Sequence, residues 1–142
     1  MIREFTLGDE KEISALEIEC FSSPWSENAV LESHNSNTKF FVFEENKKIL
    51  GYAGLQLVLG EGYITNIAVT KLARGRGIGK ALVDALINFG KEQNLAFISL
   101  EVRESNIPAI SLYKKCGFKD MGKRKNFYQN PREDANILTK EF

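Results

Sequence analysis

The chain has 142 residues, of which 43% are apolar and ten are Phe, enough to fill one sizeable core. Nineteen basic side chains balance nineteen acidic ones, so no overall field holds the protein on nucleic acid or anionic lipid. Two cysteines and one histidine cannot complete a tetrahedral zinc site of the usual kind, so no metal is expected.

The amino-terminal residues carry no targeting or membrane signal. Residues 1–12 include several acidic side chains and no apolar leader, and no later segment approaches the ~18 uninterrupted apolar residues of a membrane span. These features predict a soluble cytoplasmic protein that does not contact membranes. The chain shows no repeat and no Pro-rich linker, so residues 1–142 are expected to form one domain. Cys20 and Cys116 belong to no short motif, and both are expected to be free, partly buried thiols.

The first half of the chain reads as one strand, two helices and three further strands. Residues 2–7 alternate like a short strand, and Gly8-Asp9 opens a helix that places Ile13, Leu16 and Cys20 on one face. Ser26 is a good N-cap for a second helix that runs to about residue 33. Strands are then predicted over residues 39–44, 49–58 and 63–69, with turns at 46–47 and 60–62, which favours an antiparallel meander.

The second half alternates helices with strands. Apolar residues from Ile78 to Phe89 recur at helical spacing, and Asn94 can end that helix. Residues 96–102 form the next strand, whose alternation puts Glu101 on the face opposite Leu100. Ser105-Asn106 caps a shorter helix that ends near 117, and strands follow over 118–122, extended near 126–128, and 135–140. The fold class expected is α/β (α+β), with a mixed sheet of about six to seven strands and helices on both faces.

A glycine-rich segment, Arg74-Gly75-Arg76-Gly77-Ile78-Gly79-Lys80, lies between a predicted strand and a predicted helix. Such a turn exposes backbone N–H groups and points the positive end of the helix dipole at a bound anion, so it favours a diphosphate ligand. A dinucleotide fingerprint would need glycine at position 80, and a nucleotide-triphosphate loop would need glycine at 74 and Ser or Thr at 81. The chain has Lys80, Arg74 and Ala81 there. A purely structural tight turn remains the alternative.

Two segments in this order resemble the signature motifs of the GNAT family of N-acetyltransferases. They are the run Arg74-x-x-Gly77-x-Gly79 and the run Asn106-x-x-Ala109-x-x-Leu112-Tyr113-x-x-x-Gly117-Phe118, and the resemblance extends over nearly the whole chain. Four further runs, residues 24–27, 66–69, 100–106 and 132–135, are similar to the bacterial ribosomal-protein-alanine branch of the family. The resemblance implies an acetyl-CoA-dependent N-alpha-acetyltransferase. The implied acceptor is a protein N-terminus, most simply the N-terminal alanine of a small-subunit ribosomal protein.

The resemblance also implies a cofactor site. The pantetheine arm would lie against the backbone of Ile67, Ala68 and Val69, and the pyrophosphate would lie on the glycine segment. Asn106 matches the side chain that bonds the pantetheine, although a plain N-cap role suits it equally well. The residues implied to bind acetyl-CoA are Ile67, Ala68, Val69, Arg74, Gly75, Arg76, Gly77, Ile78, Gly79, Lys80 and Asn106.

Two catalytic residues are implied in the same way. Glu101 matches the general base, acting through a water, and its alternative is an exposed strand carboxylate. Tyr113 matches the general acid that faces the thiol, and its alternative is an amphipathic core tyrosine. Glu61 is the reserve base.

Other assignments stay open at this stage. Trp25 is either a core anchor or a wall of the peptide groove. The run 123–125, Lys-Arg-Lys, is interpreted as a solvated turn, and His34 as a surface residue. The alternative functions are a small-amine (polyamine or antibiotic) N-acetyltransferase and a non-catalytic acyl-CoA-binding sensor, and the presence of both candidate catalytic groups opposes the second.

Overall fold

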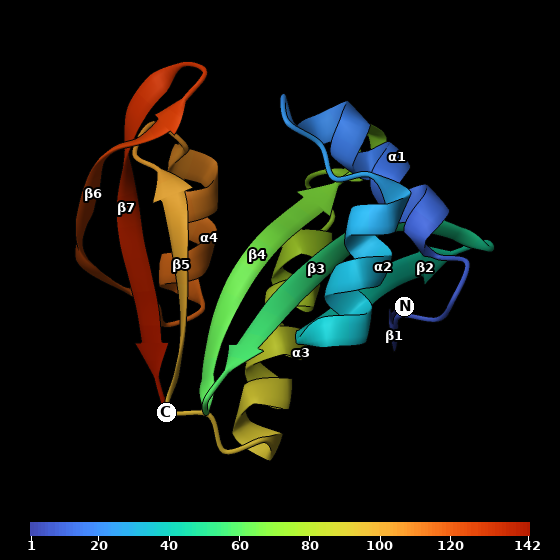
Figure 1. The fold of residues 1–142 in the computed structure, drawn as a ribbon, viewed down its shortest axis with the longest axis horizontal. Helices are drawn as coiled ribbons and strands as arrows, with labels where there is room; N and C mark the ends of the chain where they lie inside the picture. Colours follow the sequence, from blue (N-terminus) through green and yellow to red (C-terminus); the bar gives the residue numbers. More distant parts are fainter.

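The computed structural model describes residues 1–142 and contains seven strands, four α-helices and one 3₁₀ turn (Figure 1). The strands are β1 (Ile2–Glu4), β2 (Thr38–Glu45), β3 (Lys48–Val58), β4 (Glu61–Val69), β5 (Phe97–Arg103), β6 (Lys119–Gln129) and β7 (Arg132–Glu141). The helices are α1 (Glu10–Cys20), α2 (Glu27–Ser36), α3 (Ile78–Glu92) and α4 (Ile107–Lys115), and the turn η1 is Lys71–Ala73. No helix is long and apolar enough to cross a bilayer.

All seven strands join one mixed sheet in the order β1-β2-β3-β4-β5-β7-β6. Every neighbouring pair is antiparallel except β4 and β5, which are parallel and pair only through Gly62 with Ile98 and Tyr63 with Ser99. Beyond these two pairs the strands diverge, and Figure 1 shows β4 and β5 meeting at one end and separating toward the other. The expected mixed sheet is therefore confirmed, and β4 and β5 are separate over most of their length.

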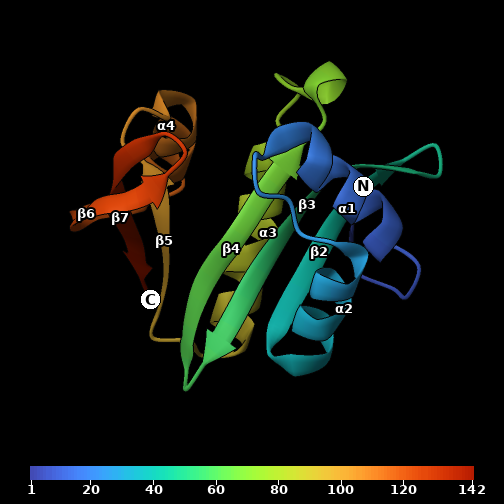
Figure 2. The same cartoon turned by 45° about the horizontal axis from the view of Figure 1, so that its top comes forward.

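The helices cover both faces of the sheet. Apolar side chains point to both faces of the central strands, so each face needs a covering layer. Figure 2 shows α1 and α2 on one side of β2–β4 and α3 on the other. The α1/α2 side holds a core that includes Ile13, Val30 and Tyr52. The α3 side holds a larger core, which continues under α4. Leu100 belongs to that larger core, whereas Glu101 faces the opposite way, as the sequence predicted.

Local signals account for the helix ends. The Ser26 hydroxyl accepts a hydrogen bond from Ala29 N at 3.1 Å, and the Asn106 side chain accepts one from Ala109 N at 3.3 Å. Asn94, which follows α3, has φ +55°, a conformation that asparagine tolerates at helix ends. The predicted caps are confirmed at these three positions.

Two predicted turns are wrong. The turn between β3 and β4 is Leu59-Gly60 rather than 60–62, because Glu61 and Gly62 already pair with β3. The run 123–125 lies in strand β6, where Arg124 pairs with Ala135 of β7. Charge predicted a solvated turn there, but pairing with β7 determines the backbone. His34 is half-buried in α2, and its ring lies 4.4 Å from that of Phe5.

A β-bulge interrupts the pairing of β3 with β4. Ala53 pairs with Ile67 but Leu55 pairs with Ile64, so β4 carries one extra residue opposite Gly54. A side chain on Gly54 would come within 2.5 Å of Thr65 Oγ1 and 2.8 Å of the Phe40 ring. The bulge and the close approach of the two strands therefore depend on glycine at this position.

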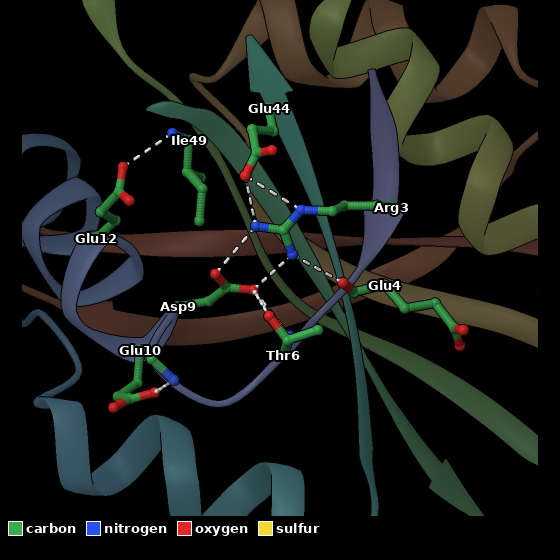
Figure 3. Close-up of polar contacts among 9 residues, drawn as sticks. Arg3, Glu4, Thr6, Asp9, Glu10, Glu12, Glu44 and Ile49 are labelled. Carbon is green, nitrogen blue, oxygen red and sulfur yellow. Dashed lines mark hydrogen bonds and ion pairs between the residues drawn. The ribbon is translucent and has the colours of Figure 1, made fainter. Parts of the chain in front are cut away.

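A polar cluster joins β1 to the start of α1 and to β2 (Figure 3). The guanidinium of Arg3 donates to Asp9 Oδ2 at 2.8 Å and to Glu44 Oε2 at 2.7 Å. Asp9 also accepts from the backbone N–H of Thr6 at 2.8 Å. The carboxylate that precedes α1 thus fixes the β1–α1 connection instead of capping the helix.

Candidate active site

The divergence of β4 from β5 creates two grooves, one on each face of the sheet. The groove on the α3 side has a volume of about 550 Å³ and runs from the glycine segment to α4; we call it the cofactor groove. The other, about 670 Å³, lies between β4, β5 and the β6–β7 hairpin; we call it the acceptor groove. The residues that line both grooves are Cys20, Phe21, Ile67, Asn106, Ala109 and Tyr113. The two grooves therefore meet in the gap between the strands.

The glycine segment forms one end of the cofactor groove. Gly75 and Gly77 each have φ +81°, and open space surrounds the position where a side chain would be on either one. Gly77 is the N-cap of α3, so the first N–H groups of that helix have no partner within it and face the groove end. Gly79 serves a second purpose, because a side chain there would come within 3.3 Å of Leu112 on α4.

The three basic residues of the glycine segment lie in different surroundings. Arg74 lines the cofactor groove, where its Nε donates to Val69 O at 3.0 Å. Arg76 and Lys80 line neither groove: Arg76 pairs with Glu45, and Lys80 pairs with Asp84 at 2.8 Å. Of the predicted cofactor residues, the structure brings Ile67, Ala68, Val69, Arg74, Gly75, Gly77, Ile78, Gly79 and Asn106 into one groove.

Asn106 lies where the two grooves meet and is also a helix cap. Its Oδ1 accepts from Ala109 N, so the capping role is present, and its Nδ2 has no partner within the chain. A ligand can therefore use the amide nitrogen without disturbing the cap.

Tyr113 projects from α4 to the junction of the grooves. The residue is only 7% exposed, and its ring packs edge-on against Phe118 with centroids 5.5 Å apart. No group of the chain forms a hydrogen bond with its hydroxyl, although that oxygen is not fully enclosed. Burial, with smaller effects from Cys116 and Tyr128, raises the pKa of Tyr113 above its ordinary value. The hydroxyl therefore keeps its proton well into the alkaline range.

Glu101 lies on the other face, in the acceptor groove. Its Oε1 forms an ion pair with Arg124 Nε at 3.0 Å. Glu61, at the closed end of the strand pair, lines neither groove and accepts a hydrogen bond from the Tyr63 hydroxyl at 2.6 Å. Of the two candidate bases, only Glu101 faces the acceptor groove.

The β6–β7 hairpin forms a wall of the acceptor groove that the sequence did not reveal. Arg103 fixes this wall: its guanidinium lies 4.3 Å from the Tyr128 ring centroid and donates to Pro131 O at 2.9 Å. It also pairs with Glu133 at 3.2 Å. Arg124 reaches Glu101 from the same hairpin, so part of the run interpreted as a solvated turn lies beside the site.

Trp25 does not line either groove. Its ring meets Phe40 edge-on, with centroids 6.4 Å apart, at the border of the α1/α2 core. Of the two interpretations of Trp25, the structure favours the core anchor. The free, half-buried thiols of Cys20 and Cys116 agree with the sequence prediction.

The chain is similar to proteins of one known family. Residues 10–118 match the acetyltransferase (GNAT) family. A putative [ribosomal protein bS18]-alanine N-acetyltransferase of Bacillus subtilis is 35% identical over 139 residues, 96% of this chain and 92% of the relative. The [ribosomal protein bS18]-alanine N-acetyltransferase of Escherichia coli K12 is 37% identical over 117 residues, 81% and 79% of the two chains.

The fold also matches a solved structure. A crystal structure of the ribosomal-protein-S18-alanine N-acetyltransferase from Escherichia coli superposes with a TM-score of 0.91 and 32% identity. The superposition covers 99% of this chain and 92% of the other.

Proposed function

The chain belongs to the acetyltransferase (GNAT) family, and from that premise we propose that it is an acetyl-CoA-dependent N-alpha-acetyltransferase. The proposed acceptor is the N-terminal amine of a protein, namely the N-terminal alanine of a small-subunit ribosomal protein. One observation carries the proposal: Tyr113 of α4 and Ile67 of β4 line both grooves, so the two grooves meet at the gap between β4 and β5. Two substrates can thus meet there without competing for the same space.

The cofactor groove suits a phosphorylated, arm-shaped substrate. Its glycine end offers backbone N–H groups at a helix N-terminus, where an anion such as a pyrophosphate is stabilised. Beyond Tyr63 the edge of β4 is not paired with β5, so its backbone from Ile67 to Val69 can bond an extended pantetheine arm as a neighbouring strand would. Asn106 Nδ2 is a further free donor.

The proposed reaction is a direct attack. Glu101 accepts a proton from the acceptor amine through a water, and the amine nitrogen forms a bond to the thioester carbonyl carbon. When the carbon–sulfur bond breaks, Tyr113 gives its proton to the departing thiolate. Addition of the amine gives a tetrahedral intermediate, which then expels the thiolate. Because Glu101 and Tyr113 lie on opposite faces of the sheet, the carboxylate can serve the amine while the hydroxyl serves the sulfur. The products are an N-acetylated protein and free CoA.

An N-terminal amine suits a single carboxylate base. Its pKa is near 8, against about 10.4 for a lysine side chain, so a far larger fraction is neutral or easily deprotonated at pH 7. We therefore expect little transfer to internal lysine.

A thiol-release assay with acetyl-CoA tests the proposal. The panel contains Ala-first peptides, the same peptides with a blocked N-terminus and an internal lysine, a polyamine, and no acceptor. We expect release only with free N-termini, fastest with alanine first. Preferential use of the polyamine would replace the proposal by the small-amine alternative. Binding of acetyl-CoA without release for any acceptor would favour the sensor alternative.

A further inference from the structure

The most deeply buried carboxylate of the chain takes no part in the proposed reaction. Glu17 of α1 is 0% exposed and forms no ion pair. Its Oε1 accepts the backbone N–H of Trp25 at 2.9 Å. Its Oε2 accepts the hydroxyl of Tyr52, which is also 0% exposed, and Asn66 Nδ2 at 3.2 Å. A buried carboxyl group is costly, so a fully satisfied one indicates a specific purpose.

This carboxylate determines which way the Asn66 amide points. An asparagine amide has a donor end and an acceptor end, whereas an ionised carboxylate can only accept. Burial raises the pKa of Glu17, and the hydrogen bonds that Tyr52, Trp25 and Asn66 donate to it act in the opposite direction by stabilising the ionised form. The backbone N–H of Trp25 can only donate, and it bonds Oε1 of Glu17. The Tyr52 hydroxyl and the Asn66 amide both bond the other oxygen, Oε2. Asn66 must therefore present Nδ2 to Glu17, and its Oδ1 is left facing away from that cluster.

Asn66 lies beside the junction of the two grooves. Asn66 is in the β-bulge of β4 and lines the acceptor groove. Ile67, the next residue, lines both grooves, so Asn66 is one residue, about 3.3 Å along a strand, from the point where the grooves meet. No donor of the chain bonds Asn66 Oδ1, and this oxygen is not among the fully enclosed ones.

We propose that Asn66 Oδ1 accepts a hydrogen bond from the acceptor's amine and orients it for attack, with Glu17 as the positioning residue that fixes the amide. This inference rests on the proposed function. A primary amine has two N–H bonds besides its lone pair. One bond directed to Asn66 and one directed toward the Glu101 side leave the lone pair free to face the thioester.

Glu17 also holds a second wall of the acceptor groove. Its bond to Trp25 N, together with the bond from Ser14 Oγ to Trp25 O at 3.0 Å, ties the α1–α2 loop to α1. Phe21 and Ser22, at the start of that loop, line the acceptor groove. The buried carboxylate of Glu17 is thus hydrogen-bonded both to the α1–α2 loop and to the β4 bulge, and both segments line the acceptor groove.

Steady-state kinetics on four variants test the inference: Asn66→Ala, Glu17→Gln, the double variant, and Glu19→Gln as control. Glu19 lies on the same helix but is exposed, and it bonds Thr70 and the backbone of Lys71 outside both grooves. We expect Asn66→Ala to raise the peptide KM about tenfold, with the Kd for acetyl-CoA within twofold of wild type. Glu17→Gln should raise KM similarly, because a glutamine amide can donate to Asn66 Oδ1 and let it turn. The control should match wild type.

The double variant separates orientation from general damage. If Glu17 acts through Asn66, adding Glu17→Gln to Asn66→Ala should change the peptide KM by less than twofold. An unchanged KM in Asn66→Ala, or fully additive effects, would overturn the inference. If Glu17→Gln does not fold, the peptide KM of Asn66→Ala by itself tests whether Asn66 binds the acceptor amine. Should the wild-type enzyme prefer a different amine, that amine is used for the same comparison, so a wrong acceptor and a wrong role for Asn66 give different results.

Discussion

Replacement of Tyr113 by Phe separates the chemistry of this residue from its packing. The ring packs against Phe118, whereas the hydroxyl has no hydrogen-bond partner in the chain. Removing that hydroxyl therefore breaks no internal bond, and the free energy of unfolding should change by less than about 1 kcal/mol. For a chain of this length such a change moves Tm by no more than roughly 4 °C.

The effect on turnover should be much larger. Loss of a general acid typically lowers the rate by about 10²-fold, which corresponds to ~2.7 kcal/mol of activation free energy. Because burial raises the pKa of Tyr113, the wild-type hydroxyl stays protonated above the ordinary tyrosine value near 10. Its titration should therefore cause no fall in kcat between pH 7 and 9.

The assay is thiol release at saturating acetyl-CoA and peptide, with Tm and the Kd for acetyl-CoA measured on the same preparations. Phe118→Leu is the matched control: it disturbs the ring packing, keeps the hydroxyl, and should cost about 1–2 kcal/mol of stability with a much smaller loss of kcat. A Tyr113→Phe enzyme with kcat within threefold of wild type would refute the acid role. A drop in Tm well beyond the expected few degrees would make Tyr113 a packing residue.

Three further predictions concern the base, the glycine segment and the Arg3 cluster. Glu101→Gln should lower kcat/KM at pH 7 by about 10²-fold, with partial recovery as pH rises and the free amine fraction grows; a pH profile like that of wild type would exclude Glu101. Gly77→Val adds a branched side chain at φ +81° in the cofactor groove, so the calorimetric Kd for acetyl-CoA should rise at least tenfold, about 1.4 kcal/mol. Unchanged affinity in a folded variant would reduce the segment to a structural turn. Although burial alone would raise it, hydrogen bonds from Arg3 and Thr6 lower the pKa of Asp9. Asp9 therefore contributes stability above its unfolded pKa of about 3.9, which is lost as pH falls through the lower folded value. Urea unfolding should show that Asp9→Asn costs about 1–2 kcal/mol at pH 7 and less at pH 3, and equal costs at both would contradict this.

Several parts of the fold and site could be predicted because their signals are local. The caps at Ser26 and Asn106 need only one side chain and the next turn of helix. The alternation of residues 97–102 depends only on strand geometry, so it correctly placed Glu101 on the face opposite Leu100. The glycine segment likewise required only its own residues and the helix that follows.

Other features depend on partners distant in the sequence. The polar appearance of Glu17 in a helix gave no sign that it would be buried against Tyr52 and Asn66, 35 and 49 residues away. Residues 123–125 were predicted to be a turn because their charges are visible in the sequence itself. Their pairing with β7 depends on a second strand and is not visible there. For the same reason, the ion pair between Arg124 and Glu101 was not foreseen.

The amino-acid sequence by itself determined the order of the elements, the glycine segment and the family, because periodicity, caps and spaced motifs act over a few residues. Only the tertiary structure decided where β4 leaves β5, which groups line each groove, and how Asn66 and Tyr113 face the gap. β4 and β5 pair only through Gly62 with Ile98 and Tyr63 with Ser99, and β4 carries a bulge opposite Gly54 beyond these pairs. The β4–β5 pairs join residues 36 positions apart, and the energies of such contacts depend on the packing of the whole sheet.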